Sequence, residues 1–173
     1  MKHILLAAAF VPFFAFAQGH SPYAGQHHRE IKSLSDEETR QYLSGAGMGY
    51  GRAAELNGFP GPMHVLELAD KLGLSTDQRA ATQRLMESHK AEARALGAKR
   101  VAAEKELDAL FRSGTVDKER LANAVRQTAE IEGAYRLTHL DTHRQMRTLL
   151  TDEQAAKYKE LRGYGGAGHK PNP

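Results

Sequence analysis

The chain contains no cysteine and no tryptophan among its 173 residues. Without cysteine it can form no disulfide, no thiolate nucleophile and no cysteine-ligated zinc cluster. The lack of tryptophan and a mean hydropathy of −0.57 indicate thin apolar stripes and not a thick hydrophobic core. These absences exclude cysteine enzymes and disulfide-stapled scaffolds.

An excess of charge of either sign is also lacking. Lys and Arg total 24 against 21 Asp and Glu, a formal net charge of +3. A nucleic-acid partner would require a concentrated basic patch, so we expect none. The acidic residues are scattered beside Lys or Arg and no Ser/His/Asp order is recognisable, so we do not expect an enzyme. An ordinary solvated face is predicted for Glu92, Arg94, Lys99, Arg100, Glu104, Lys105 and Glu106.

One long apolar run is present, at the N-terminus. Lys2 precedes the apolar residues 4–16, and Ala15 and Ala17 fit the small-residue rule for signal-peptide cleavage. The run is too short for a comfortable membrane span. We expect export to the periplasm with cleavage near Ala17, the alternative being an uncleaved anchor. The predicted organisation is a signal peptide over 1–17, a flexible polar arm over 18–34, a helical domain over 35–164 and a disordered tail over 165–173.

Helical periodicity dominates the remainder, and no segment is a strand candidate. The glycines between 45 and 51 do not fit a G-x-G-x-x-G frame, so this stretch is interpreted as a weak or broken helix and not as a phosphate loop. The spacing of apolar residues and the positions of Gly and Pro predict an all-α chain. Helices are expected over 35–43, 63–72, 75–112, 118–149 and 151–162, with a turn over 112–117.

Two similar pentads occur in the chain, "LSTDQ" at 74–78 and "LTDEQ" at 150–154. In each, a hydroxyl residue is followed three positions later by Gln, which is the pattern of a capping box at a helix start. The midpoint of the two copies is residue 112, beside the predicted turn, so a long antiparallel hairpin would bring them together at its open end. The motif residues are Leu74, Ser75 and Gln78 in the first copy, and Leu150, Thr151 and Gln154 in the second.

Two such pentads flanking a cysteine-free helical pair behind an export signal resemble the Spy/CpxP-like periplasmic family, which carries LTxxQ motifs. The likeness covers residues 62–164. It implies a thin, curved, all-α homodimer with short flanking helices. Members of the family act as ATP-independent chaperones, restrain envelope-stress signalling, or sense and bind metals.

The segment "HLDTHRQM" offers metal-ligand chemistry. His139 and His143 are four apart and share a helix face, and Met146 adds a soft thioether. His64 lies on the short helix near the open end and is a fourth candidate. A divalent transition metal (Zn, Cu, Ni or Co) would suit this set. The alternative without a metal site is that His139 and Met146 pack between the two long helices while His143 is solvated.

Two details of this site rest on register and on resemblance. The hairpin register predicts Met86 near His139 and His89 near Tyr135. The metal-sensing branch of the family carries His-x-x-x-Met before its second motif. Met146 occupies that Met position, but Thr142 stands at the His position.

The leading functional expectation is a periplasmic chaperone or envelope-stress protein that binds unfolded envelope proteins on an apolar and charged helical cradle and requires no cofactor. The alternative is a heavy-metal sensor or metal-binding resistance protein. A third class is an adaptor that docks on the ectodomain of a membrane sensor kinase.

Overall fold

The computed structural model describes residues 21–164, which form seven α-helices, a short 3-10 helix at Gln26–His28 and no strand. The predicted signal peptide and the predicted tail lie outside the described residues. An all-helical fold with one long helical pair is as the sequence predicts. The helices are α1 (Asp36–Ser44), α2 (Arg52–Glu55), α3 (Pro62–Glu67), α4 (Ala69–Leu72), α5 (Thr76–Arg112), α6 (Lys118–Leu149) and α7 (Asp152–Leu161).

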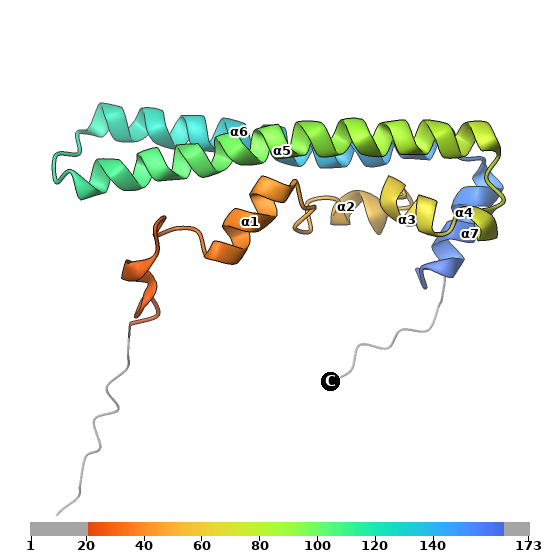
Figure 1. Cartoon of the computed structure of the whole chain (residues 1–173), viewed down its shortest axis with the longest axis horizontal. Helices are drawn as coiled ribbons and strands as arrows, with labels where there is room; N and C mark the ends of the chain where they lie inside the picture. Colours follow the sequence, from red (N-terminus) through yellow and green to blue (C-terminus); the bar gives the residue numbers. More distant parts are fainter. Residues whose placement is uncertain (1–20, 165–173) are drawn as a thin grey trace, which may run out of the picture.

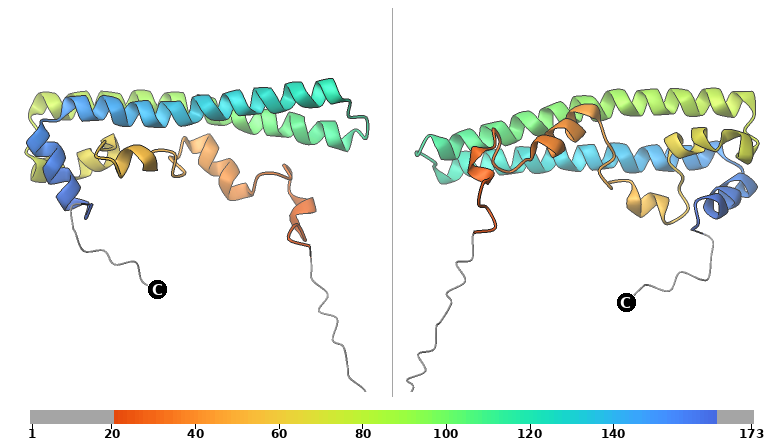
Figure 2. Two further views of the ribbon diagram at one scale, coloured as in Figure 1. Left: turned by 180° about the vertical axis from the view of Figure 1, so that it is seen from behind. Right: turned by 60° about the horizontal axis from the view of Figure 1, so that its bottom comes forward.

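The long helices α5 and α6 lie side by side, and the shorter elements run along one side of them (Figure 1). With 37 residues, α5 spans about 55 Å at 1.5 Å per residue. Helices α1 to α3 follow the pair from its middle toward one end, where α4 and α7 lie together (Figure 2). Within 21–164, no helix is both long enough and apolar enough to span a membrane.

Helix starts are fixed by local capping. Ser35, Ser75 and Thr151 each accept a hydrogen bond from the backbone N–H three residues on, and the side chain of that third residue accepts from the cap's own N–H. The capping boxes predicted at the two pentads are therefore confirmed, and Ser35 with Glu38 forms a third. Asp117 caps α6 by accepting from the Arg120 N–H at 2.8 Å.

The single helix expected over 63–72 is two helices. Helix α3 begins at Pro62, a favoured residue for the first helical turn, and the backbone leaves helical geometry at Leu68 (φ −99°, ψ 10°). Helix α4 then ends at Gly73, whose positive φ of 64° suits glycine. Residues on both sides of the break pack into one apolar cluster, so tertiary packing accounts for a bend that periodicity does not reveal.

Two apolar clusters stabilise the fold. The first lies at the end where α4 and α7 meet the long pair, and the second lies where α1 and the preceding segment pack on α5 and α6. The first contains Val65, Ala69, Leu72, Leu74, Met146, Leu150 and Tyr158, and the second contains Ile31, Leu34, Tyr42, Ala93, Val101 and Tyr135.

The segment before α1 differs from the flexible polar arm expected over 18–34. In its described part, Ile31 and Leu34 are buried, with only 3% and 6% of their surface exposed. The Ser33 hydroxyl donates to Glu104 Oε2 at 2.6 Å. Two isolated apolar residues carry no helical or strand period, which is why the sequence does not disclose their burial.

The prediction that the charged residues of α5 form a solvated face is also partly wrong. Arg100 and Glu104 are buried and form an ion pair with each other, and Arg100 also lies 3.4 Å from Glu132 Oε2. The guanidinium lies 5.7 Å from the ring centre of Tyr42. Since a buried charge requires a partner, the i,i+4 spacing of Arg100 and Glu104 makes burial beneath the N-terminal segment tolerable.

Candidate functional site: the pentad corner and the histidine cavity

The two pentads meet, as the sequence predicts, at the end of the long pair. The Gln78 side-chain amide donates to Gln154 Oε1 at 2.8 Å, and the Gln154 amide donates to Gln78 Oε1 at 3.0 Å. Gln78 also donates to the Leu149 carbonyl at 2.9 Å. Each glutamine thus closes its own capping box and bonds to the other pentad. We call this arrangement the pentad corner.

Beside the corner, a cavity of about 570 Å³ lies between the 44–64 segment and the long pair. It contains four histidines from three helices, and we call it the histidine cavity. Three of the four predicted metal ligands line it, as does His89, which the sequence places elsewhere. The side chains relevant to metal binding are His64, Met86, His89, His139 and His143, with Met48 and Met63 also on the wall.

The predicted trio of His139, His143 and Met146 is not brought together. Met146 is fully buried in the first apolar cluster and does not line the cavity. At the family-type position, the Thr142 hydroxyl donates to the Thr138 carbonyl at 2.7 Å and contacts His89 Nδ1 at 3.1 Å. The family-type ligand set therefore does not fit. Across residues 21–164, no group of three or more His, Asp or Glu side chains is already spaced to hold a metal ion.

The hydrogen bonds fix which ring nitrogen of each buried histidine carries the proton. His139 Nδ1 lies 2.8 Å from the Tyr135 carbonyl, which can only accept, so Nδ1 donates. Because the Thr142 hydroxyl donates its single proton to the Thr138 carbonyl, it accepts a hydrogen bond from His89 Nδ1. In the neutral form, His89 and His139 each keep a lone pair on Nε2.

His143 and His64 follow the same rule. His143 Nδ1 donates to the Phe59 carbonyl at 2.7 Å, and His64 Nδ1 faces Glu67 Oε2 at 2.9 Å. The His143 ring fits closely between Gly51 and Gly61, where a Cβ on either glycine would press against it. Its Nε2 is therefore enclosed by backbone, whereas His89 and His139 meet each other across the two long helices.

Burial keeps the two central rings neutral. Desolvation lowers the pKa of His89 to about 4, helped by the nearby His139. Desolvation is also the main cause of a lowered pKa at His139, opposed by its carbonyl partners at Tyr135 and Ala46. The Ala46 carbonyl accepts from the Tyr135 hydroxyl at 2.6 Å. His139 Nε2 is buried without a hydrogen-bond partner, which costs about 1–3 kcal/mol for an ordinary polar group.

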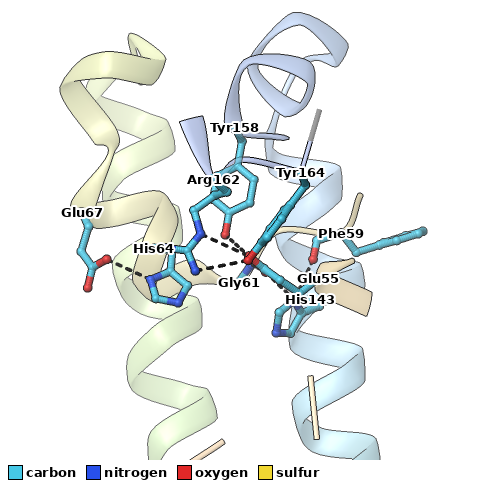
Figure 3. A network of polar contacts seen from close by, with 9 residues as sticks. All are labelled: Glu55, Phe59, Gly61, His64, Glu67, His143, Tyr158, Arg162 and Tyr164. Atoms are coloured by element: carbon cyan, nitrogen blue, oxygen red, sulfur yellow. Dashed lines mark hydrogen bonds and ion pairs between the residues drawn. The ribbon is translucent and has the colours of Figure 1, made fainter. Parts of the chain in front are cut away.

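A second polar feature ties the cavity to the corner. Tyr158 and Arg162 from the α7 region, the Gly61 N–H and His143 all converge on Glu55, whereas His64 turns to Glu67 (Figure 3). The Tyr158 hydroxyl donates to Glu55 at 2.5 Å and the Gly61 N–H donates to it at 3.1 Å. His143 Nδ1 and Arg162 Nε each lie 3.6 Å from a Glu55 oxygen. We call this set the Glu55 network. It links α2, α3, α6 and α7.

Sequence reasoning missed His89 and Glu55 as site residues. The predicted register placed His89 near Tyr135, but its ring lies 4.6 Å from that of His139 and it bonds to Thr142. The predicted register was centred on residue 112, the midpoint of the two pentads, and it placed His89 four residues, or about one helical turn, away from its actual neighbour His139. Centring the register on the middle of the predicted turn would have given a closer pairing. No local signal marked Glu55.

No family model, curated protein or solved structure matches this chain. The resemblance carried by the two pentads therefore supports a proposal of function and does not show a family.

Proposed function

We propose that the chain is an exported LTxxQ-type stress protein that binds unfolded envelope proteins without ATP. The observation that carries this proposal is a set of large apolar side chains left exposed on the short elements. The exposed fractions are 49% for Leu43, 56% for Leu56, 40% for Phe59, 47% for Met63 and 41% for Leu161. These residues come from α1, the 56–59 link, α3 and α7.

All of these elements lie on one side of the long pair (Figures 1 and 2). Charged residues of both signs are exposed among them, such as the Arg40–Glu37 pair on α1. Separate apolar contacts of this kind bind an unfolded chain weakly, and mixed charges let clients of either sign approach. Weak contacts release a client without an energy source, which suits a compartment that lacks ATP.

The proposal is tested by light scattering from a chemically denatured client diluted into buffer with the purified protein. Leu56→Ser/Phe59→Ser should reduce suppression of aggregation several-fold. The control is Tyr23→Ser, which removes a large side chain that is 74% exposed in the segment before α1 and belongs to neither the proposed client surface nor the long pair. Equal activity of the double variant, the control and the parent would overturn the proposed surface.

Export and assembly belong to the same proposal. The N-terminal apolar run supports secretion to the periplasm, and the family resemblance supports a thin, curved hairpin that pairs as a homodimer. Mass spectrometry of the secreted protein should give Gln18 as its first residue. Specific capture of one sensor-kinase ectodomain, with no effect on client aggregation, would instead favour the signalling adaptor.

A second candidate function is metal binding, as a heavy-metal sensor or resistance protein. It is favoured by the buried, unpartnered His139 Nε2 beside a second neutral imidazole in the histidine cavity. Metal uptake that depends on His139 would support this candidate without bearing on client binding.

A further inference from the structure

We propose that the histidine cavity binds one soft monovalent cation, Cu(I) or Ag(I), through Nε2 of His89 and His139 with the Met86 thioether as third ligand. This inference rests on the second candidate function and names the class of metal and the ligands. It differs from the set predicted from sequence, which was His64, His139, His143 and Met146. Only His139 is kept, and His89 and Met86 on α5 supply the other ligands.

The ligand atoms are assigned by the hydrogen bonds. Both rings use Nδ1 as a donor, His139 to the Tyr135 carbonyl and His89 to the Thr142 hydroxyl, so Nε2 is the available lone pair on each. Metal-ligating histidines in proteins usually show this arrangement, with the second nitrogen held by a carbonyl or similar acceptor. The rings meet edge to face with centres 4.6 Å apart, one from each long helix.

Met86 completes the set from the first long helix. It lies three residues before His89, so the two side chains share a helix face, and both line the cavity. A thioether is a soft ligand that favours monovalent copper over hard cations. Its flexible side chain can approach a bound ion without movement of the backbone.

The small number of ligands argues against the divalent metals. Structural zinc sites have four ligands and catalytic sites three from protein, and no group of three His, Asp or Glu with metal-site spacing exists within residues 21–164. Nickel and cobalt sites have more ligands than zinc sites. A closed-shell monovalent ion is stable with two or three soft or borderline ligands.

Charge points the same way. The desolvation cost of an ion rises with the square of its charge, so a divalent ion costs about four times as much as a monovalent one in a largely apolar cavity. The one carboxylate on the wall, Glu55, is already bonded to Tyr158 and to the Gly61 N–H. Two cationic side chains, Arg52 and Lys90, also line the cavity, and they further disfavour the higher charge of a divalent ion.

The test is an anaerobic titration of the purified full chain with Cu(I) in competition with bicinchoninate, repeated with Ag(I) as a redox-inert probe. We expect one ion per chain. The copper X-ray absorption spectrum of the unmodified protein should show two imidazole nitrogens and one sulfur. That measurement does not depend on the folding of any variant.

Variants then assign the ligands. Met86→Leu keeps the side-chain volume and should lose the sulfur signal and at least about tenfold in affinity, as should His89→Gln. Met63→Leu, a second methionine on the cavity wall, and His27→Ala/His28→Ala in the N-terminal segment should bind like the parent.

The possible failures are distinguishable. Tight Zn²⁺ or Ni²⁺ binding that exceeds Cu(I) binding would overturn the inference and leave the metal-binding function standing. Loss on Met63→Leu with none on Met86→Leu would overturn the named ligand set. Absence of binding by every ion would overturn both the inference and the second candidate function, while the chaperone proposal would be unaffected.

Discussion

At the scale of single residues, the pentad glutamines do more than cap helices. Gln78 and Gln154 exchange two hydrogen bonds across the corner while each also accepts from its own cap residue. Gln78→Ala and Gln154→Ala should each lower the free energy of unfolding by about 1–2 kcal/mol. In a double-mutant cycle the two changes should couple by about 1 kcal/mol, because each removes the other's partner.

Urea denaturation of the four proteins in that cycle gives the coupling. Glu38→Ala provides the control, because Glu38 closes the same kind of capping box in α1 but touches neither pentad. It should be additive with Gln154→Ala. A purely additive Gln78/Gln154 pair would mean that the two copies are independent helix starts.

Another residue-scale prediction concerns acid stability. The folded-state pKa of His89 is lowered to about 4 from an ordinary value of 6.5, mainly by burial. Below pH 6.5 the unfolded chain therefore binds the proton first, and the free energy of unfolding falls as the pH falls, until about pH 4. The contribution is complete above pH 6.5. Allowing for partial exposure of the ring, it amounts to about 1–2 kcal/mol.

His89→Gln should accordingly flatten the dependence of melting temperature on pH between 6.5 and 4, relative to the parent. His27→Gln, an exposed substitution in the N-terminal segment, should leave the profile unchanged. Parallel profiles for His89→Gln and the parent would show that this ring titrates normally.

At the scale of elements, the docking of α1 depends on one glycine in α5. A Cβ at Gly97 would clash with the Tyr42 carbonyl oxygen, whereas a Cβ at Gly133 in α6 would meet nothing within 4 Å. Gly97→Ala should lower the free energy of unfolding by about 1–3 kcal/mol through overpacking. Gly133→Ala should raise it by about 0.5–1 kcal/mol, because alanine is the better helix former.

Chemical denaturation measures both variants against the parent, and amide hydrogen exchange localises the effect. Exchange in Gly97→Ala should increase over 31–44 and not over α7. A gain in stability from both substitutions would show that α1 does not lie this close to α5.

The Glu55 network makes a separate element-scale prediction. Glu55→Ala removes the acceptor shared by Tyr158 and the Gly61 N–H, so α7 and the 56–62 link should loosen together. The expected loss is about 2–3 kcal/mol, because these are bonds to a charged group. Glu67→Ala removes an exposed carboxylate paired with His64 and should cost well under about 1 kcal/mol. Hydrogen exchange over 152–164 distinguishes the two, and equal protection in both variants would contradict the role of the network.

How far the sequence predicts this fold depends on whether a signal is local. Helix starts at Ser35, Ser75 and Thr151 were predictable because a capping box is confined to four residues. The break at Leu68 was not, because it depends on packing against α7. The burial of Arg100 was hidden for a similar reason, since its cover comes from a segment about seventy positions earlier.

The candidate site shows the same division. His139 and His143 were identifiable from their spacing on one helix. The partner of His139 could be found only through interhelical register, and an error of one helical turn predicted Met86 beside His139 and left His89 next to Tyr135. Helical spacing correctly places Met146 on the same face of α6 as His139. It does not reveal that an apolar cluster covers Met146 there, which is why Met146 was wrongly predicted as a metal ligand.

At the scale of the whole molecule, the long pair is covered unevenly. The short helices pack along one side of α5 and α6 (Figure 1), whereas Phe111, Val125 and Leu137 on the long helices keep 60%, 49% and 65% of their surface exposed. Large apolar side chains left bare on a monomer often mark an interface. We therefore propose that clients bind to the short elements and that the chain self-associates through these three residues of the long pair.

Introducing one charged side chain on either surface tests whether assembly and client binding use different surfaces. Leu137→Glu would bury a carboxylate without a partner in the interface, so it should weaken a micromolar homodimer by at least about tenfold. Leu43→Glu, at a similarly exposed leucine on α1, should leave the dimer intact and reduce client binding instead. Sedimentation velocity over a range of concentrations measures the first effect and light scattering the second. A monomer at every concentration in the parent would remove the dimer, and loss of assembly in Leu43→Glu alone would place the interface on the short helices.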